Sequence, residues 1–294
     1  MRHSINIPNF GDFADVDKII TLARAAEECG WDALFLWDHV VHDKARRRGV
    51  PFADPWVALT AVALSTERLR LGPLLTPVAR RRPEQLAREV ATLDGLSGGR
   101  VIFAAGLGAP IEDEFGSFGD HADAKQIAGR LDEGLELINR YWSGERVDHD
   151  GRYYQVRDVE LLPTPVQRPR PPVWIGGYWP TRAPMRRAAR WDGAVPLFHS
   201  AQHGVAPDPA EVADLVAFIA GRRHGQAESM TGFEIVVGGT TPGDPAHAQT
   251  IIGPLAEAGA TWWDERMPQT DEDFMHFEPI LRRVEQGPPR LLGS

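Results

Sequence analysis

The chain has 294 residues and a single cysteine, Cys29, so no disulfide can form within it. No apolar run approaches the roughly 18 residues that a membrane-spanning helix needs, and no charged-then-apolar leader precedes the first predicted strand. The sequence also has no Gly-x-Gly-x-x-Gly between a strand and a helix, and no His-x-His. These absences argue against secretion, membrane insertion, a tightly bound dinucleotide and a multi-histidine metal site. We therefore expect a cytoplasmic protein without a membrane partner.

Charge and hydrophobicity describe an ordinary globular chain. The net charge of −9 is spread along the sequence, which disfavours nucleic acid as a partner. Apolar residues make up 43% of the chain, enough for a sizeable core. The length alone would suit two domains, but barrels of more than about 200 residues commonly form one domain.

Eight short apolar runs, each followed by a helical pattern, organise almost the whole sequence. Runs of this length are typical of strands buried on both faces of a parallel sheet, and eight βα units in this length predict a single (β/α)8 TIM barrel over residues 1–294. The predicted strands are Ser4–Pro8, Ala33–Trp37, Arg70–Leu75, Val101–Gly106, Val173–Gly177, Gly193–Phe198, Phe233–Gly239 and Ala260–Glu265.

The segments between the strands are predicted from their start and stop signals. Helices are expected over Val16–Cys29, from Pro55, over Pro83–Leu96, up to about Trp142, and over Asp271–Gln286. Residues 143–172, between the fourth and fifth strands, break the rhythm: Asp150-Gly151 indicates a hairpin, and a proline-rich connector follows. We interpret this segment as an excursion of the barrel, and the polar segment 200–209 as a lid.

A TIM barrel carries its chemistry at the C-terminal ends of its strands. This rule selects a short set of candidates: Asn9, Asp38, His39, Thr76, Gly106 to Gly108, Gly176, Gly177, His199, Thr240 and Arg266.

Several motifs, in order and at predicted strand ends, resemble the luciferase-like monooxygenase family. They are GWDALFLWDH (30–39), TERLRLGPLLTPVARRRPEQLAREVATLDGLSGGRV (66–101), GLG (106–108), YWSGERVDHDGRYY (141–154), PPVWIGG (171–177) and RWDG (190–193). The resemblance covers residues 1–200 closely and the last two βα units more loosely. It implies a flavin-type oxidoreductase that uses FMN or its deazaflavin relative, coenzyme F420, and it does not distinguish the two.

The pair Asp38-His39 follows the second strand and should point into the barrel mouth. The resemblance places it beside the ring system of the cofactor, where an imidazole would stabilise the negative charge left by hydride addition. We predict His39 and Asp38 as catalytic residues. Asp38 would orient the imidazole or bind the pyrimidine ring of the cofactor.

Further cofactor contacts are implied by the resemblance at three other strand ends. The hydroxyl of Thr76 would contact the ring, and some family members have a non-prolyl cis bond near this strand end. Leu107 and Gly108 follow the fourth strand, where a glycine lets the backbone approach a flat ring or its ribityl chain. The cofactor phosphate is predicted near Gly176 and Gly177, at the start of the next helix.

The same helix start adds aromatic candidates, and the charged residues nearby leave alternatives open. Tyr178 and Trp179 would stack on or wall the cofactor, with packing as the equal alternative. Arg80, Arg81 and Arg82 either cap a charged loop or contact phosphate.

The motif after the fourth strand also departs from the family pattern. In F420-dependent sugar-phosphate dehydrogenases a glutamate acts as acid or base where this chain has Ala109. Glu112 stands where those enzymes use an amide to hold the cofactor, and the resemblance makes it a predicted cofactor contact. Either Glu112 or Glu114 could replace the missing carboxylate after a loop shift. The departure argues against a sugar dehydrogenase.

We therefore predict a luciferase-like monooxygenase that uses reduced FMN on a small organic substrate, with an F420-dependent reductase or dehydrogenase as the alternative. The partners implied are that substrate, a separate flavin or F420 reductase, and a second copy in a homodimer. Two other classes stay open: a non-catalytic flavin-binding protein, because of Ala109, and a metal-dependent hydrolase, which His39 and His199 alone support poorly.

Overall fold

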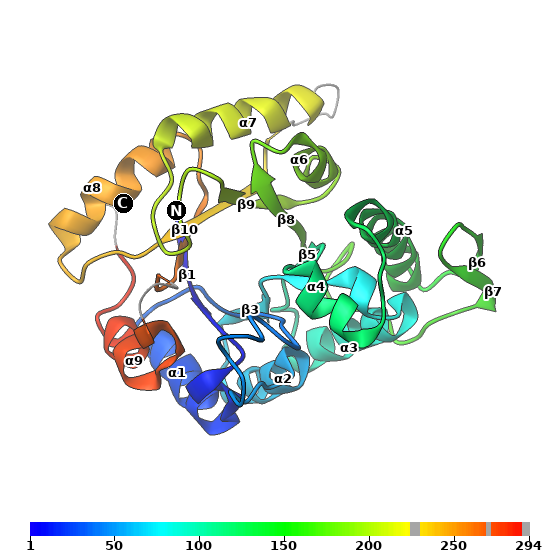
Figure 1. Ribbon diagram of the computed structural model, residues 1–294, viewed down its shortest axis with the longest axis horizontal. Helices are drawn as coiled ribbons and strands as arrows, with labels where there is room; N and C mark the ends of the chain where they lie inside the picture. The colour runs from blue at the N-terminus through cyan, green and yellow to red at the C-terminus, as the bar shows by residue number, and fades with distance from the viewer. Residues whose placement is uncertain (224–229, 269–271, 290–294) are drawn as a thin grey trace.

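The chain forms a closed ring of parallel strands surrounded by helices (Figure 1). The structure, a computed structural model, describes residues 1–223, 230–268 and 272–289. The strands of the ring are β1 Arg2–Ile7, β2 Ala33–Leu36, β3 Arg70–Pro73, β4 Thr76–Pro77, β5 Phe103–Gly106, β8 Val173–Trp179, β9 Gly193–Phe198, β10 Glu234–Gly239 and β11 Trp262–Glu265.

The described helices lie outside the ring (Figure 1). The α-helices are α1 Val16–Glu28, α2 Pro55–Ser65, α3 Pro83–Leu96, α4 Ile111–Glu114, α5 Ala124–Trp142, α6 Arg182–Ala188, α7 Pro209–Arg223, α8 Pro245–Glu257 and α9 Phe277–Glu285. Short 3-10 helices are η1 Gly11–Ala14, η2 Val78–Arg80, η3 Gly116–Phe118 and η4 Glu272–Met275. None of the helices that the structure describes is both long enough and apolar enough to span a bilayer.

Strand order confirms the predicted (β/α)8 barrel. The strands follow one another as β3-β2-β1-β11-β10-β9-β8-β5-β4, and every neighbouring pair is parallel. A parallel bridge between Leu71 and Val101 joins β3 to the residues before β5 and closes the ring. β3 and β4 together form the third barrel strand, interrupted at Leu74 and Leu75, whose peptide bond is cis.

The side chains divide into two layers, as strand alternation requires. One hydrophobic cluster fills the inside of the barrel and includes Phe35, Ile102, Trp174 and Trp262. The largest cluster lies between strands and helices and includes Leu34, Phe103 and Trp263. Alternate residues of one strand therefore reach either the barrel interior or the helical layer.

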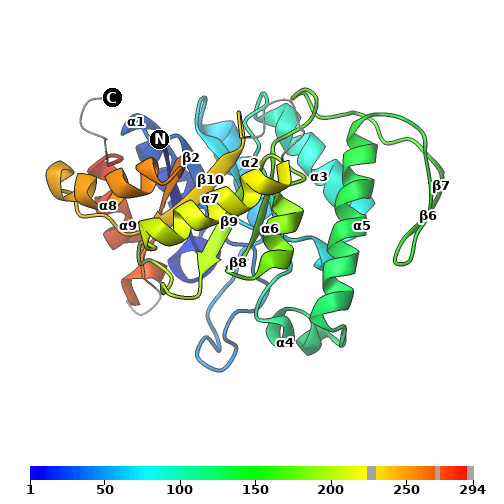
Figure 2. The same cartoon turned by 90° about the horizontal axis from the view of Figure 1, so that it is seen from above.

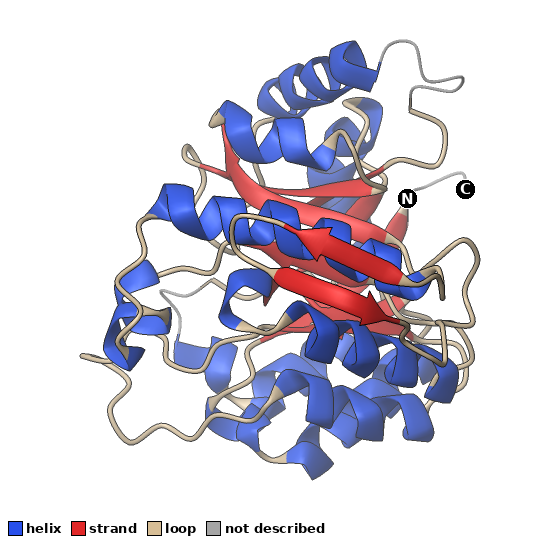
Figure 3. Ribbon diagram, turned by 90° about the vertical axis from the view of Figure 1, so that its right-hand side faces the viewer, coloured by secondary structure: helices blue, strands red, loops and turns tan. Residues whose placement is uncertain are grey.

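The excursion between the fourth and fifth barrel strands is a hairpin, as predicted. β6 Val147–Asp150 and β7 Gln155–Val159 pair antiparallel and lie over the helices on one side of the molecule (Figure 3). The final helix is shorter than expected: α9 begins at Phe277 after His276, and the predicted start at Asp271 lies outside the described residues.

Candidate active site

His39 lies just after β2, and the backbone around it is fixed by Asn9, which follows β1. The Asn9 side chain is fully buried. Its Nδ2 donates to the carbonyl oxygens of His39 at 2.8 Å and of Ala53 at 2.7 Å, and its Oδ1 accepts from the His39 N–H at 3.2 Å. One amide therefore joins the segments after β1 and β2 to the residues just before α2, so that the His39 backbone is held in place.

The His39 imidazole is oriented by Glu114, the last residue of α4. Nδ1 of His39 lies 2.8 Å from Oε1 of Glu114, whose side chain has no exposed surface. Within the described part of the chain, Nε2 of His39 has no hydrogen-bonding partner, and the side chain is 18% exposed. A carboxylate at Nδ1 leaves Nε2 as the ring nitrogen that faces a ligand.

Asp38 is held by arginines and does not contact the imidazole. Arg80 binds the carboxylates of both Asp38 and Glu114 and also donates to the Asp38 carbonyl oxygen at 3.1 Å. Nη2 of Arg81 lies 3.3 Å and 3.4 Å from the two carboxylate oxygens of Asp38. Glu114, and not Asp38, thus orients His39, because the arginine side chains occupy the Asp38 carboxylate.

The arginines form a buried ion-pair network. Burial opposes the charge on Arg81, but the carboxylates of Asp38, Asp54 and Glu89 raise its pKa overall. Arg82 turns away and pairs with Glu84 at 2.9 Å. The three arginines therefore match the charged-loop alternative, with carboxylates as their partners.

Two aromatic rings lie close to the His39 imidazole. The ring of His42 lies 4.4 Å from that of His39, and the ring of Trp37 lies 5.8 Å away. Desolvation lowers the pKa of His42 to about 4. In Figure 2 the connection that carries His42 reaches out at the same end of the molecule as α4.

Polar atoms without partners mark the barrel end near β1 and β4. Thr76 is fully buried, and its Oγ1 has no hydrogen-bond partner among the described residues. The same holds for Oδ1 of Asn6. Buried hydroxyl and amide groups rarely stay unpaired, so these atoms fit the polar edge of a bound ring. This fit includes Thr76, a predicted cofactor contact.

Leu75 fills the space between β5 and β8. A Cβ atom added at Gly106 or Gly176 would lie 2.3 Å or 1.9 Å from its methyl carbons. Because these two glycines have no Cβ atom, the Leu75 side chain can occupy the space beside them.

The structure does not bring the other predicted contacts to the same place. The ring of Trp179 packs against Phe218 of α7 at 5.2 Å, and a Cβ atom at Gly177 would meet Pro184 of α6 at 2.3 Å. Both residues face the helices because they alternate with Gly176 and Tyr178 along β8. In the structure, Gly177 and Trp179 pack against the helices α6 and α7. Their proposed binding of the cofactor or its phosphate stays a prediction.

The segment after β5 has a similar division. Gly108 has a φ of +86° and lies close to Pro77 and Phe115, a conformation that favours glycine. Leu107 packs against the outer core. Glu112 is exposed, with its carboxylate against Gly116, so Glu114 is the glutamate that reaches His39.

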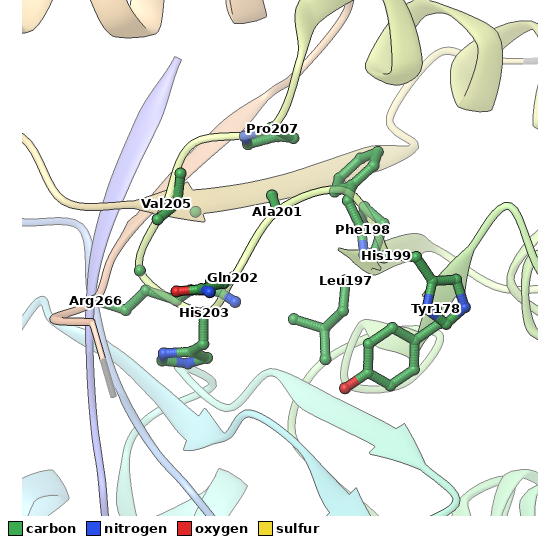
Figure 4. Close-up of a pocket in the computed structure, with 13 residues that line it drawn as sticks. Tyr178, Leu197, Phe198, His199, Ala201, Gln202, His203, Val205, Pro207 and Arg266 are labelled. Carbon is green, nitrogen blue, oxygen red and sulfur yellow. The ribbon is translucent and has the colours of Figure 1, made fainter. Parts of the chain in front are cut away.

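A cavity of about 430 Å³ opens at the C-terminal ends of β8, β9, β10 and β11 (Figure 4). Arg266 and His203 lie at one end, and Tyr178 and His199 at the other, with Leu197 between them (Figure 4). Segment 200–209, the expected lid, forms part of its wall. Across the ranges that the structure describes, no three His, Cys, Asp or Glu side chains gather in a way that could hold a metal ion.

Sequence reasoning named His39, Thr76 and Tyr178 as candidates but missed the roles of Arg80 and His203. Arg80 ends η2 and Glu114 ends α4, and only the fold shows that they meet. Arg266 was selected by its place after the last strand, although its role was not assigned.

A parallel barrel with an oriented imidazole and a cavity at its C-terminal end is the architecture of a barrel oxidoreductase or hydrolase. The chain belongs to the luciferase-like monooxygenase family, which matches residues 3–276.

Curated relatives add names to this match. An F420-dependent glucose-6-phosphate dehydrogenase of Microbacterium testaceum is 34% identical over 168 residues, 56% of this chain and 48% of that protein. The corresponding protein of Beutenbergia cavernae is 38% identical over 141 residues, 48% of this chain and 41% of that protein. The alignments thus span about half the length of these relatives.

Solved structures share the fold across nearly the whole chain. The monooxygenase RslO1 from Streptomyces bottropensis has a TM-score of 0.76 at 21% identity, covering 97% of both chains. The FMN complex of the oxygenating constituent of 3,6-diketocamphane monooxygenase from Pseudomonas putida has a TM-score of 0.75 at 15% identity, covering 99% of both chains. The F420-dependent tetrahydromethanopterin reductase of Methanopyrus kandleri has a TM-score of 0.74 at 17% identity, covering 97% and 96%.

Proposed function

We propose that this protein is an oxidoreductase that uses reduced FMN or coenzyme F420 on a small organic substrate. The observation that carries the proposal is His39 at the barrel end, with Nδ1 held by Glu114 and Nε2 free for a ligand. When bound, such a cofactor supplies a hydride or its equivalent. The imidazole Nε2 would hold a proton beside the group on which negative charge develops.

The residues near the barrel end support binding of a flat polar ring. Thr76 Oγ1 and Asn6 Oδ1 are buried acceptors without partners, and Thr76 Oγ1 is also a donor. The names of the sequence relatives favour F420, and a monooxygenase with FMN and a separate reductase is the second form of the proposal. Homodimerisation is proposed from the family resemblance.

Ala109 supports a departure from sugar-phosphate oxidation. It is exposed and carries no carboxylate, and the nearby Glu114 is fully buried against His39 and Arg80. Both carboxylate oxygens of Glu114 are already bound, one to His39 and the other to Arg80, so this side chain orients the imidazole. We therefore propose Glu114 as a positioning residue and His39 as the catalytic acid.

Anaerobic titration with oxidised and reduced FMN and F420 tests the proposal. We expect one of them to quench tryptophan fluorescence saturably, because Trp37 lies beside His39. Absence of quenching by all four forms at millimolar concentration would contradict it. Binding without turnover of any reduced cofactor would instead favour the non-catalytic flavin-binding alternative.

A further inference from the structure

We propose that the cavity at the ends of β8 to β11 binds a small, neutral, largely apolar organic molecule, whose carbonyl oxygen accepts a hydrogen bond from Arg266. That this molecule is the substrate rests on the proposed function, whereas its binding does not.

Arg266 is a buried donor that lines the cavity. It follows β11 directly, and only 6% of its surface is exposed. Its Nε has no hydrogen-bond partner among the residues that the structure describes. A Cβ atom at Gly238 of β10 would lie 2.4 Å from this Nε, so the guanidinium lies directly against the strand. Such a buried N–H group needs an acceptor, and the cavity is where one can enter.

The charge of Arg266 is already balanced inside the barrel. Its Nη2 lies 2.7 Å from Oδ2 of Asp264, which is fully buried. The Asp264 carboxylate also accepts from Oγ of Ser4 at 2.6 Å and from Nδ2 of Asn6 at 2.8 Å. These donors stabilise the ionised carboxylate, so Asp264 and Arg266 together carry no net charge.

The second polar group at this end is neutral. His203 is largely buried against Trp37, with ring centroids 5.0 Å apart. Desolvation, together with the nearby Arg266 charge, lowers its pKa to about 3. This end of the cavity therefore has unsatisfied donor capacity without net positive charge.

This balance selects the chemistry of the ligand. A carboxylate or phosphate that entered the cavity would lose its hydration shell, and the positive charge of Arg266 is already paired with Asp264. Burial of such an anion is therefore costly. A ketone, aldehyde or ester oxygen accepts the same hydrogen bond at a much smaller desolvation cost. The uncharged carbonyl group is therefore the better match.

The opposite end of the cavity suits an apolar body. Tyr178 and His199 stack with ring centroids 4.8 Å apart, and Leu197 lies between this stack and His203 (Figure 4). Flat and aliphatic surfaces thus form the rest of the wall, as in most small-molecule sites.

Cyclohexanone and cyclohexanecarboxylate, matched in ring size, test the proposal by titration of the 15N-labelled full chain without cofactor. We expect cyclohexanone to bind at least tenfold more tightly and to shift amide signals of residues 199–206. The assignment is overturned by equal or tighter binding of the carboxylate, or by no binding of either probe at these amides.

Two variants test the charge balance. Asp264→Asn leaves the Arg266 charge uncompensated, so we expect the ratio of the two dissociation constants to move at least tenfold toward the carboxylate. Should this variant fail to fold, Arg266→Lys keeps the charge but removes Nε, and we expect at least fivefold weaker cyclohexanone binding. Arg82→Lys, outside the cavity, is the matched control. An unchanged ratio in folded Asp264→Asn, or unchanged affinity in Arg266→Lys, would refute the role of Arg266.

The cofactor titration separates this inference from the proposed function. If neither FMN nor F420 binds but cyclohexanone does, the proposed function fails and the cavity assignment stands. If a saturating cofactor binds and expels cyclohexanone, the cavity is the cofactor site and the substrate assignment fails. Simultaneous binding of cofactor and ketone supports both.

Discussion

At the residue scale, the proposed function assigns proton transfer to His39 and the orientation of its imidazole to Glu114. His39→Asn removes the ring at a partly exposed position, so we expect a melting temperature close to that of the wild type and about 10²-fold lower turnover. Glu114→Gln also removes the negative charge beside Arg80, so we expect a similar loss of turnover together with roughly 3 kcal/mol of stability. Steady-state kinetics and urea unfolding measure both.

The matched control for Glu114 lies outside the site. Glu28 is exposed at the end of α1, and Glu28→Gln should change neither turnover nor stability. Full stability of Glu114→Gln, or wild-type turnover of His39→Asn, would contradict these assignments.

His42 makes stability depend on pH. Burial lowers its folded-state pKa to about 4, while the unfolded side chain titrates near 6.5. As the pH falls, the unfolded chain therefore protonates His42 before the folded chain does. The contribution of neutral His42 to the free energy of unfolding is fully present above pH 6.5 and is lost as the pH falls toward 4. His39, Arg47, Asp43 and Glu114 are the charged or titratable groups that act on it.

His42→Phe should remove about 2 kcal/mol of the stability difference between pH 7.5 and pH 5, measured by urea unfolding at each pH. The exposed His121→Gln is the control and should leave the difference unchanged. The same difference in His42→Phe and wild type would show that His42 is not desolvated.

At the scale of elements, closure of the barrel depends on Gly72 in β3. A Cβ atom there would lie 2.0 Å from the carbonyl oxygen of Ile102, a backbone atom that cannot rotate away. We expect Gly72→Ala to separate β3 from the residues before β5, at a cost of about 3 kcal/mol or more. Thermal unfolding measures the loss.

Gly95 provides the comparison for the same substitution in the same region. It is exposed in α3, and its added Cβ atom would meet nothing within 4 Å. Gly95→Ala should raise stability by about 0.5–1 kcal/mol, because the unfolded chain loses freedom. Equal changes in stability for Gly72→Ala and Gly95→Ala would mean that the contact between Gly72 and Ile102 does not require a glycine.

At the scale of the whole molecule, the last helix, α9, packs against the N-terminal part of the barrel. Trp31 donates from Nε1 to the carbonyl oxygen of Val284 at 3.0 Å, and Ile280 and Val284 of α9 are buried in the outer core. The family match ends at residue 276, just before this helix. The packing shows that α9 nevertheless covers the start of the barrel.

A chain that ends at His276 should therefore lose several kcal/mol of stability, since each fully buried aliphatic side chain contributes about 1.5–3 kcal/mol. Differential scanning calorimetry on the truncated and full chains checks this. Arg282→Ala, on the exposed face of α9, should melt like the wild type. A truncated chain as stable as the full one would contradict the role of α9.

Sequence patterns predicted the eight barrel strands, most helix starts and the β6–β7 hairpin, because apolar runs, proline and glycine act locally. They also placed His39 and Thr76 at strand ends, since topology puts strand ends on one side of a barrel. The third strand was predicted as one run, Arg70–Leu75, whereas the structure has two short strands, β3 and β4, separated by Leu74 and Leu75.

The partners of the site residues depended on tertiary structure. Glu114 reaches His39, Arg80 joins Asp38 to Glu114, and Asp264 neutralises Arg266, although their segments are far apart in the sequence. Strand parity turned Trp179 toward the helices and Tyr178 toward the cavity. The sequence by itself determined the barrel, because each element follows from local periodicity. Only the folded barrel decided which charges meet, because ion pairs form between groups that closure brings within a few ångströms.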